Sequence, residues 1–314
     1  MNSKIFLHAI AFAVVAVWGS TFVVTKMLLL DGLSPAQVFT LRFVIAYVLL
    51  LAYSIGCFVF RSSRSTLHAP RFSLFASSWR DEFLMVLLGI TGGSVYFLAE
   101  NAAMLYTTAT NTSLIVCSCP LFTMLLMAVF WRKTERFTRV QVMGSLLACL
   151  GMAIVVMNGH FVLHLSPLGD LLAFAACLCW AFYSLLTKKA VERYAPLFIT
   201  RKVFFYGLLT MIPYYILMPS EAGIFISPST LHLPPSIIFN LLFLGVVASL
   251  LCYVLWNWVI SKLGAVVATN WVYCNPLVTI LFAWWLLNEP VTPWLILGTL
   301  LILFGMYFAD RKHQ

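Results

Sequence analysis

Two charged residues lie within otherwise apolar stretches of the sequence, Glu100 in GGSVYFLAENAAMLYTTATN and Arg42 in SPAQVFTLRF. A carboxylate in such a place can hold an amine or exchange a proton, and an arginine can hold a carboxylate. Each also has a structural interpretation. Arg42 or Lys26 could pair with Glu100 and stabilise the fold, and the long Arg42 side chain could instead reach the surface. The sequence leaves these alternatives open.

Other polar and aromatic residues recur at matched positions. The stretch from Gly89 to Pro120 aligns with the stretch from Gly245 to Pro276 without a gap, which makes Asn101 equivalent to Asn257. A buried amide needs hydrogen-bond partners, so these asparagines either bridge neighbouring helices or line a cavity. The candidates for a substrate-binding central cavity are Trp18, Tyr96, Glu100, Asn101, Tyr253, Asn257, Trp271, Tyr273 and Asn275.

Pro120 and Pro276 are also equivalent in this alignment. Proline removes a backbone hydrogen bond and kinks a helix. Interrupted helices at corresponding positions of two halves are typical of the binding region of a secondary transporter. We therefore expect helix kinks near the substrate site at both prolines.

The repeat extends over the whole chain. Further landmarks recur with matched spacing: Trp18 and Lys26 with Trp180 and Lys188, and Glu135, Gly144 and Gly151 with Glu289, Gly298 and Gly305. The sequence thus predicts two repeats, residues 1–158 and 159–314. The glycines lie seven residues apart, on one helix stripe, which favours close packing against another helix or a dimer partner.

The composition places the chain in a membrane. Of 314 residues, 62% are hydrophobic and 9% are charged, whereas soluble domains carry about 25% charged residues. The net charge of +9 comes from short loops and not from a basic helix face, so no nucleic-acid partner is expected. The eight cysteines all fall in apolar segments, and we expect no disulfide framework, metal or cofactor.

A membrane-spanning helix needs about 20 mostly apolar residues. The predicted spans are approximately residues 5–28, 36–59, 83–105, 110–131, 139–158, 168–188, 197–218, 236–260, 266–287 and 293–309. Because each half has an odd number of spans, the second copy enters the membrane from the opposite side. The predicted fold is an all-α integral membrane protein with ten transmembrane helices in two inverted five-helix repeats.

Charges in the loops predict the orientation. Lys and Arg concentrate in alternate loops, and the opposite loops hold Asp31, Asp170, Glu221 and Glu289. Basic loops stay in the cytoplasm, so both termini are expected there, with the chain spanning the inner or plasma membrane several times.

These residues resemble a known family. WGSTFVVTK followed by SPAQVFTLRF, and WAFYSLLTK followed by NPLVTILFAWWLLNEPVTPWLILGTLLILFGMYFA, are similar to the two halves of EamA-type members of the drug/metabolite transporter superfamily. The resemblance implies ten helices, a central cavity, and carriage of small metabolites, often the export of amino acids. Trp256 stands where the second copy would carry the equivalent of Glu100, so the resemblance assigns no role to Glu100, and that role stays open.

The expected function is secondary transport of small metabolites, amino acids or related amphiphiles, as an exporter that works by alternating access. A passive facilitator is the alternative within transport. A membrane-embedded enzyme acting on lipid-linked substrates is disfavoured because the acidic residues are scattered singly, so we expect no enzyme. The expected partners are a small-molecule substrate and the lipid bilayer. Glu100 and Arg42 are the candidates for coupling or for charge in the cavity. Coupling to protons through Glu100 and formation of a homodimer stay open.

Overall fold

The computed structural model describes residues 3–62, 73–130, 138–157, 167–222, 234–287 and 293–309, and every regular element in these ranges is helical. Helices long and apolar enough to cross a bilayer share high hydropathy over at least 18 residues. They are Lys4–Leu30, Pro35–Gly56, Trp79–Tyr106, Ala109–Phe130, Pro167–Ala190, Pro235–Leu263 and Ala265–Leu286. These seven candidate spans are typical of a multi-pass membrane protein.

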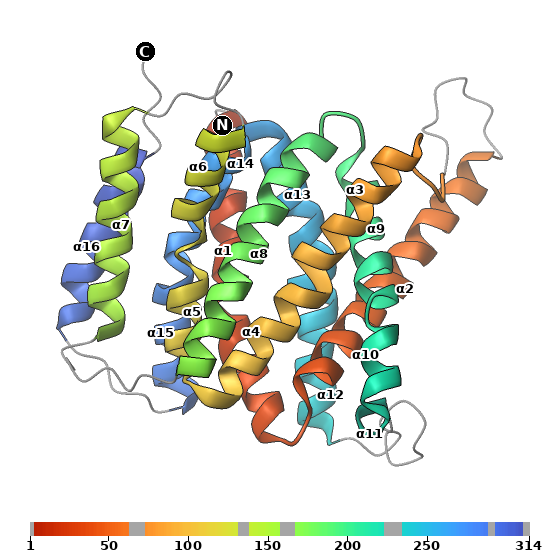
Figure 1. The fold of residues 1–314 in the computed structure, drawn as a ribbon, viewed down its shortest axis with the longest axis horizontal. Coiled ribbons are helices and arrows are strands. Elements are labelled where there is room, and N and C mark those ends of the chain that lie inside the picture. The colour runs from red at the N-terminus through yellow and green to blue at the C-terminus, as the bar shows by residue number, and fades with distance from the viewer. Residues whose placement is uncertain are drawn as a thin grey trace.

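The helices lie side by side in one bundle, and most of them run roughly from the top to the bottom of the view (Figure 1). Those of the first half are α1 (Ser3–Leu30), α2 (Pro35–Ser62), α3 (Trp79–Gly89), η1 (Ile90–Ser94), α4 (Val95–Tyr106), α5 (Ala109–Val116), α6 (Cys119–Phe130) and α7 (Arg139–Met157).

The second half follows the same plan with more interruptions. Its elements are α8 (Pro167–Ala190), α9 (Pro196–Leu209), α10 (Ile212–Leu217), α11 (Pro219–Ala222), α12 (Pro235–Leu242), η4 (Phe243–Leu251), α13 (Cys252–Leu263), α14 (Ala265–Asn270), η5 (Trp271–Cys274), α15 (Asn275–Leu287) and α16 (Trp294–Ala309). The seventh predicted span consists of α9 and α10, two helices separated at residues 210–211. Glu135, Glu289 and the predicted boundary between residues 158 and 159 lie outside the described residues.

The two halves pack against each other in matched pairs. The α4 helix packs against α8, as α13 packs against α1. The α2 helix packs against η4, as α9 packs against η1 and α3. The α5 and α6 helices pack against α8, as α15 packs against α1. The core between the halves is therefore built from both copies of the repeat.

Two spans contain π-helical segments at equivalent places. Residues 90–94 form η1 between α3 and α4, and residues 243–251 form η4 between α12 and α13. Gly93 has non-helical backbone angles, φ −130° and ψ −106°, which marks a kink. A π-helical turn inserts an extra residue into the helix, and such turns are frequent at functional sites.

The glycines of α7 pack against the backbone of α16 within the same chain. A Cβ atom on Gly151 would lie 2.7 Å from the backbone nitrogen of Ile302 and 2.8 Å from the carbonyl oxygen of Gly298. One on Gly144 would lie 2.7 Å from the carbonyl oxygen of Gly305. The missing side chains let α7 and α16 approach closely, as small residues do between membrane helices. This stripe is therefore covered by the same chain.

Candidate functional site

A cavity of about 30 Å³ lies between the two halves. Six residues singled out in the sequence line it: Trp18, Arg42, Tyr96, Glu100, Tyr253 and Asn275. A water molecule needs roughly 10–15 Å³ of such space, so the cavity has room for about two waters. The centre between the halves is thus a small and partly polar space.

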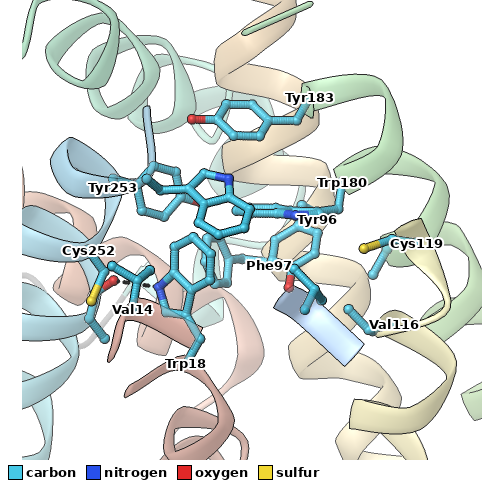
Figure 2. Packing of buried hydrophobic residues seen from close by; sticks show 14 of the residues in the cluster. Val14, Trp18, Tyr96, Phe97, Val116, Cys119, Trp180, Tyr183, Cys252 and Tyr253 are labelled. Atoms are coloured by element: carbon cyan, nitrogen blue, oxygen red, sulfur yellow. Dashed lines mark hydrogen bonds between the residues drawn. The ribbon is translucent and has the colours of Figure 1, made fainter. Parts of the chain in front are cut away.

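Aromatic rings form the walls of the cavity. The Trp18 ring lies 5.2 Å from the Trp180 ring and 5.9 Å from the Tyr253 ring, both in edge-on arrangements. Figure 2 shows these side chains gathered from different helices, with Tyr96 and Phe97 beside them. Edge-to-face packing is the favoured geometry for aromatic pairs, and it gives the cavity rigid apolar sides.

Two of these rings are fixed by hydrogen bonds to backbone carbonyls. Trp18 Nε1 donates to the Ala248 oxygen at 2.9 Å. The Tyr253 hydroxyl donates to the Gly92 oxygen at 2.5 Å. Both acceptors lie within π-helical segments, so the interruptions of η1 and η4 position side chains of the cavity.

Arg42 is held on one side of the cavity. It is 1% exposed, so its side chain lies inside the bundle and does not reach the surface. Its Nε donates to the Ser249 hydroxyl oxygen at 2.9 Å. Its Cζ lies 4.4 Å from the centre of the Phe97 ring, a cation–π contact. These contacts place a buried guanidinium beside the cavity.

Glu100 is held on α4. It is 6% exposed, and its Oε1 accepts a hydrogen bond from the Tyr96 hydroxyl at 2.7 Å. Among the described residues, no ion pair joins Arg42 to Glu100. Lys26 Nζ donates to the Met104 oxygen at 2.5 Å and to the Thr107 oxygen at 3.3 Å, and so satisfies the end of α4. Of the pairings considered from the sequence, a direct ion pair between Arg42 and Glu100 is absent from the described residues.

The equivalent asparagines lie away from the cavity lining. Asn101 Nδ2 donates to the Pro35 oxygen at 3.0 Å. Asn257 Nδ2 donates to the Thr200 hydroxyl oxygen at 2.9 Å, and Asn257 Oδ1 accepts from the Tyr183 hydroxyl at 2.8 Å. Both amides bridge neighbouring helices, the first of the two roles considered from the sequence.

Trp271 and Tyr273 also lie outside the described lining. Trp271 Nε1 contacts His8 Nδ1 at 3.1 Å. The Tyr273 hydroxyl donates to the Ser145 oxygen at 3.4 Å, at the long end of the hydrogen-bond range. These contacts tie η5 to α1 and α7.

The prolines follow breaks in their spans. Helix α5 ends at Val116 and α6 begins at Cys119, so Pro120 is the second residue of α6. The 3-10 helix η5 ends at Cys274 and α15 begins at Asn275, which makes Pro276 the second residue of α15. The residues just before the prolines, Cys119 and Asn275, both line the cavity.

Sequence reasoning did not assign Trp180 and Phe97 to the site, although both line the cavity. Trp180 had a usable signal, because it is the repeat partner of Trp18. Phe97 had none, since it is one apolar residue in an apolar span.

Comparison of the sequence with models of known protein families identifies one that matches both halves. The profile described as the EamA-like transporter family matches residues 6–157 and 167–309, one match in each half. A solved crystal structure, 19% identical in sequence, superposes with a TM-score of 0.68 and covers 98% of each chain. At that identity the likeness concerns the fold.

Curated relatives match along nearly the full length. An uncharacterized transporter of Archaeoglobus fulgidus is 27% identical over 317 residues and covers 100% of both chains. A probable terminal-alkyne amino-acid exporter of Streptantibioticus cattleyicolor is 26% identical, with coverage of 95% of this chain and 91% of the relative. A probable amino-acid metabolite efflux pump of Salmonella typhimurium is 26% identical, with 95% and 92% covered.

Proposed function

This chain belongs to the EamA-like transporter family, and we propose that it is a secondary carrier that exports small amphiphilic metabolites by alternating access. One observation carries the proposal: a cavity between the two halves combines Arg42 and Glu100 with aromatic walls. Ligand sites with apolar walls and a few polar groups suit small amphiphiles. Rocking of one repeat against the other would open such a cavity to either side in turn.

Amino acids and related compounds are the first substrates to test. Two curated relatives are named as a probable terminal-alkyne amino-acid exporter and a probable amino-acid metabolite efflux pump. The cavity fits that class, because it offers a cation, an anion and an apolar surface at once.

The proposed architecture has ten transmembrane helices in two inverted five-helix repeats, residues 1–158 and 159–314. The seven candidate spans would be completed by α7, α16 and the pair α9 and α10. Matched packing of the halves and the equivalent places of η1 and η4 support this arrangement. A two-fold axis in the membrane plane relates the halves of many secondary transporters.

Both termini are proposed to be cytoplasmic, in the cell membrane. Helix α1 begins and α16 ends at the same end of the bundle (Figure 1). Helix ends on that side carry Arg80, Arg139 and Lys262. The opposite end carries Asp31 and Asp170. This asymmetry follows the positive-inside rule.

A membrane-embedded enzyme is the alternative from a different class. Within the described lining, the cavity offers one carboxylate, Glu100, and no histidine. General acid–base chemistry on a lipid-linked substrate would be served better by several titratable groups held together. The geometry favours a binding site for a carried substrate.

The test is efflux from proteoliposomes that contain the purified chain and a mixed pool of amino acids and small metabolites, with and without an imposed pH gradient. Selective loss of one class of compound supports the carrier and names its substrates. Loss that needs no gradient indicates a passive facilitator. If protein-containing vesicles lose nothing faster than empty ones, the carrier proposal is wrong for the compounds in the pool.

A further inference from the structure

The cavity holds two opposite charges that do not neutralise each other directly. Arg42 comes from α2 and Glu100 from α4, and both line the same small space. The two groups interact electrostatically, yet within the described part of the chain no ion pair joins them. Buried charges normally pair, because leaving water is costly for each of them. Two opposite charges that line one cavity without an ion pair therefore suggest a ligand that joins them.

The contacts of Arg42 leave the two terminal nitrogens of its guanidinium group available to a ligand. Its side-chain hydrogen bond with a described residue uses Nε, and the Phe97 ring covers one face of the guanidinium. The terminal nitrogens Nη1 and Nη2 have no hydrogen-bond partner among the described residues, and they are not among the fully enclosed unpaired atoms. These two nitrogens are the pair that binds a carboxylate in the bidentate geometry of arginine.

The carboxylate of Glu100 likewise has a hydrogen-bond partner on only one of its two oxygens among the described residues. Tyr96 donates to Oε1, whereas no described residue donates to Oε2. This oxygen is not fully enclosed either. Asn275 also lines the cavity, and its side-chain oxygen Oδ1 is fully enclosed in this conformation and without a partner in the described ranges. A ligand ammonium could be satisfied by these acceptors.

We infer, on the basis of the proposed function, that the cavity recognises zwitterions: Arg42 binds the carboxylate of the substrate, and Glu100 binds its ammonium group. The ring walls formed by Trp18, Trp180 and Tyr253 contact the apolar side chain. The substrate class is then free amino acids with apolar side chains.

The two charges also explain what the site would reject. An organic cation could satisfy Glu100 but would leave Arg42 buried without a partner and would be repelled by it. A simple carboxylate would have the reverse effect. Selectivity of this kind arises because the wrong ligand leaves a buried charge unpaired. A zwitterion satisfies both groups and adds no net charge to the cavity.

The cavity must expand to take such a ligand, since about 30 Å³ is too small for an amino acid. The described conformation is therefore the contracted state of the site. Carriers need such states, because the site closes on one side before it opens on the other.

The test uses the full chain in detergent and two matched sets of ligands. One set is L-phenylalanine, phenethylamine and 3-phenylpropionate; the other is L-leucine, isoamylamine and 4-methylpentanoate. In each set the second compound lacks the carboxylate and the third lacks the amine. Binding is measured as the rise in melting temperature with ligand concentration. We expect the parent amino acid of at least one set to bind about 10- to 100-fold more tightly than both of its analogues.

Two variants test which residue binds the carboxylate of the ligand and which binds its ammonium group. Arg42→Gln should weaken amino-acid binding while sparing the amine, and Glu100→Gln should weaken it while sparing the carboxylate analogue. Arg193→Gln and Glu221→Gln serve as matched controls, because both residues lie outside the cavity lining. A purely structural role of Arg42 and Glu100 would lower the melting temperature without reversing the ligand preference in opposite directions.

The inference is overturned if a singly charged analogue binds as well as its parent, or if neither amino acid binds. Either result is separate from failure of the carrier proposal. Efflux of some metabolite from proteoliposomes without preference for zwitterions removes this inference and leaves the carrier. Absence of any efflux, together with absence of binding, removes both.

Discussion

Gly92 and Ala248 are equivalent in the two halves, and each accepts a hydrogen bond on its carbonyl from an aromatic side chain of the opposite half. Tyr253 donates to Gly92 and Trp18 donates to Ala248. Both carbonyls belong to π-helical segments, where the regular backbone ladder is interrupted. These reciprocal bonds join the two halves of the chain.

Removing either bond should favour opening of the cavity. In Tyr253→Phe and Trp18→Phe an aromatic ring remains but the donor is lost. A lost hydrogen bond of about 1 kcal/mol shifts a conformational equilibrium about fivefold. Modification of Cys119, which lines the cavity and is fully buried, should speed up correspondingly. N-ethylmaleimide labelling followed by peptide mass spectrometry measures this rate.

Tyr214→Phe is the matched control, because the Tyr214 hydroxyl bonds Glu221 Oε1 at 2.9 Å within one half. It should leave Cys119 labelling unchanged. Equal labelling rates in all of these proteins would show that the two bonds do not hold the halves together.

Glu100→Gln should abolish any stimulation of transport by a pH gradient. Glu100 is the acidic side chain in the described cavity lining, so a proton carried with or against the substrate would bind there. Glutamine keeps an oxygen that can accept from Tyr96 and removes the titratable group. Efflux from proteoliposomes with and without a gradient measures the effect.

Asp170→Asn is the control for this experiment, since Asp170 accepts from Asn111 at 2.8 Å at the end of α8. It should retain the response to the gradient. A Glu100→Gln protein that transports normally and still responds to pH would exclude coupling through this carboxylate.

The sequence predicted the helical class and much of the cavity, for identifiable reasons. Arg42 and Glu100 stood out because charges are rare in apolar spans, and Trp18 and Tyr253 because they lie near matched features of the repeat. The repeat in the sequence was also confirmed, because the family profile matches once in each half.

The sequence could not assign each residue to a helix face. Asn101 follows Glu100 directly, yet Glu100 lines the cavity and Asn101 bonds to Pro35 on a neighbouring helix. Consecutive helical residues face different directions, and a π-helical turn shifts the downstream face again. Gly92 and Gly93 were a usable signal for the η1 interruption, but a glycine pair alone does not specify a π-helical turn.

A charge pair at one end of the bundle should contribute to stability. Lys202 on α9 donates to Glu82 Oε1 on α3, Tyr206 donates to the same oxygen, and the Ala76 nitrogen donates to Oε2 at 2.6 Å. The Lys202 side chain is 4% exposed. Lys202→Met should therefore destabilise the chain by about 2 kcal/mol, because it leaves a buried carboxylate without its cation.

The neighbouring pair offers a comparison in the same region. Arg193 Nη1 lies 3.0 Å from Asp81 Oδ1, but the Arg193 side chain is 62% exposed. Arg193→Met should lower the melting temperature much less, because water screens exposed pairs. The double variant Glu82→Gln with Lys202→Met should recover part of the loss. If Lys202→Met and Arg193→Met have equal melting temperatures, burial is not what makes the Glu82 pair matter.

Gly144→Leu should separate α7 from α16. A Cβ atom at Gly144 would contact the backbone nitrogen of Ala309 and lie 2.8 Å from the Phe308 carbonyl carbon. Backbone cannot move aside as a flexible side chain can, so the helices must shift, at a cost of about 1–3 kcal/mol. Thermal unfolding followed by size-exclusion chromatography should show a lower midpoint for this variant.

Gly56→Ala is the control, because a Cβ atom there would meet nothing within 4 Å. Since α7 and α16 lie outside the cavity lining, the affinity of the folded Gly144→Leu fraction for ligand should stay unchanged. A variant with normal stability would mean that the close approach of these two helices contributes little to the fold.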